Sequence, residues 1–179
     1  VWTVVKHTEA GALSADWKLA DETPVAFHFN SIPYAVMMAT PQNLEDYAYG
    51  FSITERIVTN PAAIKAITVT PTPDGITVHM TLLGEDFKKL LQTRRAITGR
   101  TSCGVCGTED FESLHANLPK VPQKPAISIH AIRHALAHLS EHQVLNAQVH
   151  MVHAAAYCTS NGALTLIRED VGRHNALDK

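Results

Sequence analysis

The chain has 179 residues, of which 45% are hydrophobic and 18% are charged. This composition is globular and excludes a disordered chain, and the length suits one sizeable domain or two small ones. The formal net charge of −2 argues against a general basic surface for nucleic acid. The longest apolar runs are too short to span a membrane, and no stretch has the pattern of a secretory signal.

The cysteine content points to a reducing compartment. The chain has three cysteines, Cys103, Cys106 and Cys158, which is too few and an odd number for a disulfide-built extracellular scaffold. We therefore expect a cytosolic protein. In that setting the pair Cys103 and Cys106 indicates redox, metal-binding or nucleophilic chemistry.

The first half of the chain predicts two hairpins and two helices. Val25, Phe27 and Phe29 alternate with Ala26 and His28, which predicts a strand. A turn at 30–33 and a second apolar run, 34–39, complete a predicted hairpin. Thr40 and Pro41 resemble a helix N-cap and first-turn proline, and apolar residues at helical spacing follow as far as Phe51. A second hairpin is expected over 66–70 and 76–82, with its turn at Asp74-Gly75, and a second helix over 85–92.

The second half predicts a different order of elements. After a polar segment at 93–107, a short helix at 109–115 and a proline-rich loop at 117–125, residues 128–142 form a clear helix. We expect its buried face to carry Ile129, Ile132, Leu136 and Leu139. Strands follow at 149–158 and 163–167, separated by Asn161-Gly162. This order predicts an α+β or α/β protein of two lobes, residues 1–95 and 96–179.

The strongest chemical signal is the run Thr101-Ser-Cys-Gly-Val-Cys-Gly107. Its glycines let a loop bend and let a ligand approach the backbone. Nearby cations lower the pKa of a thiol and raise its thiolate fraction, and they also hold phosphate groups. The preceding residues supply Lys88, Lys89, Arg94, Arg95 and Arg100. Lys88 and Lys89 are equally well explained as a solvated helix face, whereas Arg100 lies close enough to Cys103 to favour a functional role.

Three chemistries suit the two thiols. A zinc site needs four ligands, of which this pair supplies two. A thioredoxin-type redox pair usually opens a helix after a strand, but here the surroundings are polar and rich in glycine. The third is sulfur transfer, in which one thiolate takes up the outer sulfur of a persulfide and the neighbouring thiol helps to release it. The spacing alone leaves all three open.

The second signal is the run from Asp170 through Gly172, Arg173 and His174 to Asn175. Gly172 frees the backbone before an expected helix start, where N–H groups and the Arg173 guanidinium can bind an anion. The Asp170 carboxylate can accept two hydrogen bonds from the edge of a guanine or a pterin. The alternative is a polar turn with Asp170 as an N-cap.

Histidines are the third candidate. His130, His134, His138 and His142 recur every four residues, a spacing at which two imidazoles can share a metal ion. Because we expect the opposite face to be buried, we interpret this stripe as a solvated surface and predict no metal site. His153 precedes Ala154, Ala155 and Ala156, so it either lines a pocket or is a hydrogen-bonded core histidine.

Taken together, these motifs resemble the formate dehydrogenase accessory sulfurtransferase family (FdhD). The resemblance extends over nearly the whole chain. It rests on Glu22-Thr-Pro-Val25, Met38-Ala-Thr-Pro41, Thr101 to Gly107, His153-Ala-Ala-Ala156 and Glu169 to Lys179. The cysteine run and the final run are highly specific in combination.

The resemblance implies a cytosolic sulfurtransferase that takes persulfide sulfur from a cysteine desulfurase. It passes the sulfur to the molybdenum bis(molybdopterin guanine dinucleotide) cofactor of formate dehydrogenase. Carried onto this sequence, Cys103 is the persulfide-bearing nucleophile and Cys106 its partner. The cofactor-binding residues are Arg100, His153, Asp170, Gly172, Arg173, His174 and Asn175. The family also implies a homodimer whose second lobe is similar to cytidine deaminases, although the glutamate that deaminase chemistry needs is absent.

The chain departs from the family pattern at three places. Val149-His150-Met151 stand where the family usually has Thr-Gly-Gly, Arg56 replaces a usual glycine, and the family continues beyond Lys179, so we expect a truncated form. The alternative to sulfur transfer is a module that only carries the molybdenum cofactor and keeps its activity without either thiol. A zinc-stabilised structural protein is a further alternative.

Overall fold

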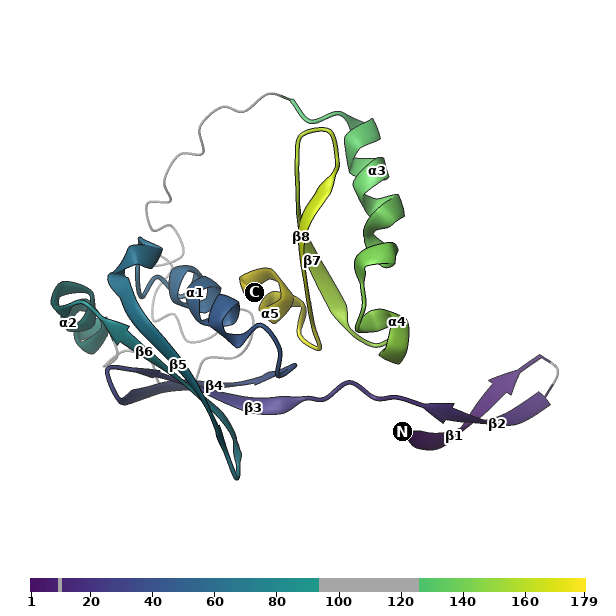
Figure 1. Cartoon of the computed structure of the whole chain (residues 1–179), viewed down its shortest axis with the longest axis horizontal. Coiled ribbons are helices and arrows are strands. Elements are labelled where there is room, and N and C mark those ends of the chain that lie inside the picture. Colours follow the sequence, from purple (N-terminus) through teal and green to yellow (C-terminus); the bar gives the residue numbers. More distant parts are fainter. Residues whose placement is uncertain (10, 94–125) are drawn as a thin grey trace.

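The protein is described by a computed structural model that covers residues 1–9, 11–93 and 126–179. Within these ranges the strands form three antiparallel or mixed sheets: a two-stranded hairpin, a four-stranded sheet, and a second two-stranded hairpin (Figure 1). Helices pack beside the second and third sheets. The architecture is therefore mixed α and β, as predicted.

The first hairpin consists of β1 (Trp2–Thr8) and β2 (Gly11–Trp17), which pair in antiparallel register with Trp2 opposite Trp17. It extends from one end of the molecule (Figure 1). Most of its side chains are exposed. An isolated two-stranded hairpin is marginally stable, so its contacts with the rest of the chain matter.

The four-stranded sheet joins the two hairpins that the sequence predicts. These are β3 (Thr23–Phe29) with β4 (Ile32–Ala39), and β5 (Ile64–Thr72) with β6 (Gly75–Leu82). The first turn holds Asn30 and Ser31 at φ values of 46° and 67°, the left-handed conformation of a tight hairpin turn. Parallel pairing of β3 with β6 gives the order β4-β3-β6-β5.

The main core lies on one face of this sheet, beneath α1 (Leu44–Thr54) and α2 (Gly84–Thr93). Phe27 is fully buried, and its ring stacks on Phe51 and meets the edge of Tyr47. Both helices were predicted from their spacing. The expected N-cap at Thr40 was wrong, because α1 begins after Asn43, which has a φ of 52°, and Thr40 makes other contacts described below.

The C-terminal part contains α3 (Ile129–Leu139), α4 (Asn146–Val149), β7 (His153–Cys158), β8 (Leu164–Asp170) and α5 (Arg173–Asp178). Short 3₁₀ helices occur at Pro61–Ala63 and Ser140–His142. Ser128 caps α3, since its hydroxyl accepts a hydrogen bond from the Ala131 N–H. α5 packs against α1 and connects this part of the chain to the main core.

Two predictions for the C-terminal part were wrong. The strand expected over 149–158 begins only at His153, because Val149 ends α4 and residues 150–152 connect that helix to the strand. The Glu169 carboxylate accepts the N–H groups of Leu145 and Asn146, each at 2.8 Å, which stabilises the helix start. The expected core face of α3 is exposed: Ile132 and Leu136 are 45% and 65% exposed, while Ala131 and Ala135 are buried.

Small residues explain this orientation of α3. A Cβ atom on Gly162, in the β7–β8 turn, would lie 2.2 Å from the Ala131 carbonyl oxygen. The helix backbone and the turn approach so closely there that only glycine fits at position 162, and the small residues Ala131 and Ala135 form the buried face of α3. The lobe boundary expected near residue 95 lies outside the described residues and stays a prediction, as does the likeness to cytidine deaminases. No helix among the described residues is long and apolar enough to cross a membrane.

Candidate functional site

The residues that the sequence singles out near the end of the chain surround one buried carboxylate. Asp170 ends β8 and is 0% exposed. Its Oδ1 accepts hydrogen bonds from Gly172 N at 2.8 Å and Asn175 Nδ2 at 3.0 Å. Its Oδ2 accepts one from Thr40 N at 2.9 Å and lies 2.6 Å from Lys179 Nζ. Each oxygen therefore has two donors, and the charge of Asp170 is compensated inside the protein.

Asn175 extends this network into the core beneath α1. Its Nδ2 also donates to the Met38 carbonyl at 2.8 Å, and its Oδ1 accepts from the Tyr47 hydroxyl at 2.7 Å. Burial, followed by the negative charges of Asp178 and Asp170, raises the pKa of Tyr47 well above its usual value. Tyr47 therefore stays neutral and acts as a hydrogen-bond donor that fixes the Asn175 amide.

Lys179 and Thr40 complete the network from opposite ends of the sequence. Lys179 Nζ donates to the Thr40 carbonyl at 2.8 Å, and the Thr40 hydroxyl accepts from Val171 N at 3.1 Å. Burial lowers the pKa of Lys179, whereas its hydrogen bond to Asp170 opposes that shift. All three polar groups of Thr40 thus bind the 170–179 segment, which explains why this residue does not cap α1.

Gly172 is required by close packing at this turn. A Cβ atom on Gly172 would lie 2.7 Å from Asn175 Nδ2, which would push the amide away from Asp170. The residues from Asp170 to Asn175 therefore hold the turn between β8 and α5 in its conformation. Of its members, Asp170 and Asn175 are buried, Gly172 is half-buried, and Arg173 and His174 are exposed.

His153 belongs to the same place in the fold. It begins β7 and is the direct register partner of Asp170 across the β7–β8 hairpin. Its side chain is exposed, which excludes the alternative of a buried core histidine. The structure therefore brings His153, Arg173 and His174 to the surface around one end of this hairpin, although 20 positions separate His153 from Arg173.

The remaining residues that the sequence singles out lie either outside the described residues or away from this network. Arg100, Cys103 and Cys106 lie outside the described residues, as do Arg94 and Arg95. Lys88 is exposed and pairs with Glu85 at 2.9 Å, as expected of a solvated helix face. Cys158, at the end of β7, is a free and exposed cysteine.

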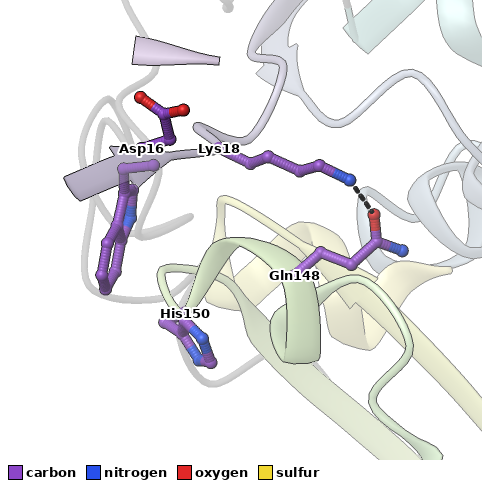
Figure 2. A pocket seen from close by; sticks show the side chains of 5 residues that line it. Asp16, Lys18, Gln148 and His150 are labelled. Atoms are coloured by element: carbon purple, nitrogen blue, oxygen red, sulfur yellow. Dashed lines mark hydrogen bonds between the residues drawn. The ribbon is translucent and has the colours of Figure 1, made fainter. Parts of the chain in front are cut away.

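Two hollows lie beside α4, and one of them reaches Thr40 of the buried network. One, of about 390 Å³, is lined by residues that include Thr40, Pro41 and Leu145. The other, of about 310 Å³, lies between the end of β2 and the end of α4. Figure 2 shows the Lys18 ammonium group reaching toward Gln148, with Nζ and Oε1 3.3 Å apart.

One of the residues that depart from the family pattern, His150, lines this second hollow. His150 has a φ of 54°, and its ring centroid lies 5.5 Å from that of Trp17. Met151 accepts a hydrogen bond from Ala20 N at its sulfur. Together with Lys18 and Gln148, these contacts attach the β1–β2 hairpin to the α4–β7 corner.

The sequence could not have revealed several of these residues. Tyr47 looked like one of the apolar positions of α1, and Lys179 stood at the end of the recognised run without any pattern that indicates a buried ion pair. Thr40 carried a signal, because it precedes a proline, but that signal indicated a helix cap. Their common role depends on contacts across more than 120 positions, which no local pattern contains.

The fold and the sequence agree in the comparison with known proteins. The structure matches a crystal structure described as that of a formate dehydrogenase accessory protein from Desulfotalea psychrophila, with a TM-score of 0.67 and 23% sequence identity. That match covers 99% of this chain and 64% of the other. The model of the FdhD/NarQ family matches residues 20–179, so the chain belongs to the FdhD/NarQ family.

Curated relatives support the same assignment. The chain is 43% identical over 164 residues to the sulfur carrier protein FdhD of Variovorax paradoxus, covering 92% of this chain and 59% of that protein. It is 41% identical over 179 residues to the protein of the same name from Xanthomonas campestris pv. campestris (strain B100), covering 100% of this chain and 64% of the relative. The chain thus spans about three fifths of the length of these relatives.

Proposed function

We propose that this chain is a sulfur carrier that serves formate dehydrogenase. Its relatives are named sulfur carrier proteins, and their match to this chain is the observation that carries the proposal. The pair Cys103 and Cys106 supplies a suitable nucleophile and a second thiol. The donor is a cysteine desulfurase and the acceptor is the molybdenum bis(molybdopterin guanine dinucleotide) cofactor, which is the substrate of the transfer.

The chemistry is thiol exchange. The Cys103 thiolate attacks the outer sulfur of the donor's persulfide, the donor's S–S bond breaks, and the donor cysteine leaves as a thiolate. Cys103 then carries a persulfide. Attack by the Cys106 thiolate on Sγ of Cys103 forms a disulfide between the two cysteines and releases hydrosulfide for the acceptor. A dithiol reductant must return both thiols before the next cycle.

The exposed residues near the β7–β8 hairpin provide the acceptor surface in this proposal. Arg173 supplies a guanidinium for a phosphate group, and His153 and His174 lie close by on the same surface. Asp170, Gly172 and Asn175 act as positioning residues, because they hold the turn that carries Arg173. Arg100 is assigned to the same surface from the sequence alone, and a homodimer is expected from the family resemblance.

The first experiment tests the nucleophile. The chain is incubated with a cysteine desulfurase and ³⁵S-cysteine, and the protein-bound label is measured before and after reduction. Cys103→Ala should abolish reducible label, whereas Cys158→Ala should leave it intact although Cys158 is exposed. Label that persists on Cys103→Ala would remove this residue from the role. Formate dehydrogenase activation that survives loss of both Cys103 and Cys106 would favour the cofactor-carrying module instead.

The second experiment tests the acceptor surface, with GDP as the probe. Arg173→Ala should weaken GDP binding in calorimetry by about 1.5–3 kcal/mol, the contribution of a charged hydrogen bond. Arg133→Ala, an equivalent change at an exposed position of α3, should leave the affinity unchanged. Equal affinities for Arg173→Ala and the unmodified chain would exclude Arg173 from the acceptor surface. About one tightly bound zinc ion per chain would instead favour the structural zinc protein.

A further inference from the structure

The orientation of α3 gives its histidines a setting that the sequence did not predict. Because Ala131 and Ala135 form the buried face, His134 lies beside the β7–β8 turn, and His138 is its neighbour one helical turn further along α3. Their rings stack, with centroids 4.3 Å apart and planes inclined by 28°. His134 remains exposed and His138 is half-buried.

Backbone carbonyl groups fix the tautomer of both rings. His134 Nδ1 lies 3.3 Å from the Gly162 carbonyl oxygen, and His138 Nδ1 lies 2.8 Å from the His134 carbonyl oxygen. A carbonyl oxygen can only accept a hydrogen bond, so each Nδ1 carries the proton. In the neutral imidazole, Nε2 then holds a free lone pair, and the geometry of the ring directs it away from the carbonyl.

This is the arrangement in which protein histidines bind metal ions. A metal-binding histidine commonly donates its other ring N–H to a carbonyl or carboxylate, which orients the ring and raises its basicity. The helix spacing already holds the two rings side by side. Metal–nitrogen bonds of about 2.1 Å place two ligand nitrogens roughly 3 Å apart, so the two rings must turn until their Nε2 atoms face a common point.

The protein also holds the pair in place before any metal binds. Contact between the Gly162 turn and the Ala131 carbonyl is too close for a Cβ atom at Gly162, so α3 and the turn have one tight packing arrangement. That packing positions the Gly162 carbonyl, which in turn orients His134. Less ordering is therefore needed on binding than for two histidines on an isolated helix.

We propose that His134 and His138 form a two-ligand surface site for a divalent transition-metal ion that favours imidazole, such as Ni²⁺ or Zn²⁺. Among the described residues no group of three or more histidine, cysteine or acidic side chains is placed to hold a metal. In the proposed site these two imidazoles are the protein ligands, and water completes the coordination sphere. The site is distinct from the proposed sulfur chemistry and does not depend on it.

The test uses Ni²⁺ as the probe on the full chain, after its three cysteines have been blocked with iodoacetamide so that thiols cannot bind the metal. Calorimetry should give one principal Ni²⁺ site. Loss of one of two linked ligands removes the intramolecular second step, so His138→Gln should bind about a hundredfold more weakly. Ni²⁺ should also raise the thermal unfolding midpoint of the unmodified chain but not that of His138→Gln.

His130→Gln is the matched control, since it removes an exposed histidine from the same helix. It should bind Ni²⁺ as tightly as the unmodified chain, and circular dichroism should give equal helix content for both variants. Equal Ni²⁺ affinity for His138→Gln and the unmodified chain would overturn the proposal. So would an equal loss of affinity in His130→Gln and His138→Gln, because the metal would then bind the histidine stripe without the oriented pair.

Discussion

Lys179 Nζ lies 2.6 Å from Asp170 Oδ2, and both side chains are fully buried. The same ammonium group donates to the Thr40 carbonyl, and the same carboxylate accepts from the Thr40 N–H. The ion pair therefore joins the end of β4 to the end of β8 and to the residue that follows α5. Because both charged groups are buried away from water, removing either one leaves the other without a counter-ion.

Lys179→Met should lower the free energy of unfolding by about 3–5 kcal/mol, because it leaves the Asp170 carboxylate buried without its counter-ion. Urea denaturation measures the effect. Lys88→Met is the control, since it breaks an ion pair whose side chains are 71% and 81% exposed and should change stability by less than about 1 kcal/mol. Similar losses in the two variants would mean that the buried pair has no special role.

Gly50→Ala should detach α5 from α1. A Cβ atom on Gly50 would lie 1.6 Å from the Asp178 carbonyl oxygen and 2.9 Å from its Cα, and these backbone atoms cannot rotate away. We expect a loss of about 3 kcal/mol in the free energy of unfolding. The hydrogen bond from the Thr54 hydroxyl to Asp178 should be lost as well.

Gly84→Ala is the matched control for this change. Nothing lies within 4 Å of a Cβ atom at Gly84, which begins α2, so the free energy of unfolding should change by no more than about 0.5 kcal/mol. Chemical denaturation of both variants separates the two cases. If Gly50→Ala proved as stable as Gly84→Ala, the close packing of α1 and α5 would be contradicted.

The elements of the four-stranded sheet could be predicted because their patterns are local. Alternation in β3 and β6, turn residues between paired strands, and helical spacing in α1 all act within about ten residues. The parallel pairing of β3 with β6 is not local, and the sequence did not predict it. The orientation of α3 was predicted wrongly because the pattern weighted large apolar residues, whereas the buried face carries Ala131 and Ala135, and the Ala131 backbone lies too close to Gly162 for a Cβ atom at that glycine.

The candidate site likewise has a local part that the sequence predicts and a long-range part that it does not. The run from Asp170 to Asn175 could be recognised from its residues, and its turn and helix start occur where expected. Its buried partners could not be recognised, since Thr40, Tyr47 and Lys179 meet it only after folding. The network turns two of the predicted binding residues, Asp170 and Asn175, inward. Their direct contact with a cofactor stays a prediction.

Arg56→Gly should stabilise the protein. Arg56 is exposed and has a φ of 56°, in the left-handed region that costs an ordinary L-residue about 1–2 kcal/mol. Glycine avoids that cost but loses part of the gain through the entropy of the unfolded chain, so we expect a net gain of about 0.5–1 kcal/mol. The family resemblance also places a glycine at this position.

Arg133→Gly tests whether backbone conformation is the cause. Arg133 is likewise exposed, but it lies within the helix α3, where glycine should cost about 1 kcal/mol. The two arginine-to-glycine changes should therefore have opposite signs in thermal or urea denaturation. Destabilisation by Arg56→Gly would show that its side chain contributes more than its backbone strain costs.

His28 should make stability depend on pH. It lies on β3 directly opposite His79 of β6, with ring centroids 4.9 Å apart. Burial, and then the neighbouring His79, lower the pKa of His28 below its ordinary value of 6.5. As the pH falls through 6.5, the unfolded chain takes up a proton at this position before the folded protein does. Acidification therefore favours unfolding.

The thermal unfolding midpoint should thus fall between about pH 7.5 and about pH 5.5, and it should fall less steeply in His28→Gln. His7→Gln is the control, because His7 is exposed in the β1–β2 hairpin, and it should keep the pH dependence of the unmodified chain. Since only the slope is compared, a uniform change in stability caused by the substitution does not affect the result. Parallel pH profiles for His28→Gln and the unmodified chain would mean that the His28 and His79 pair does not control this dependence.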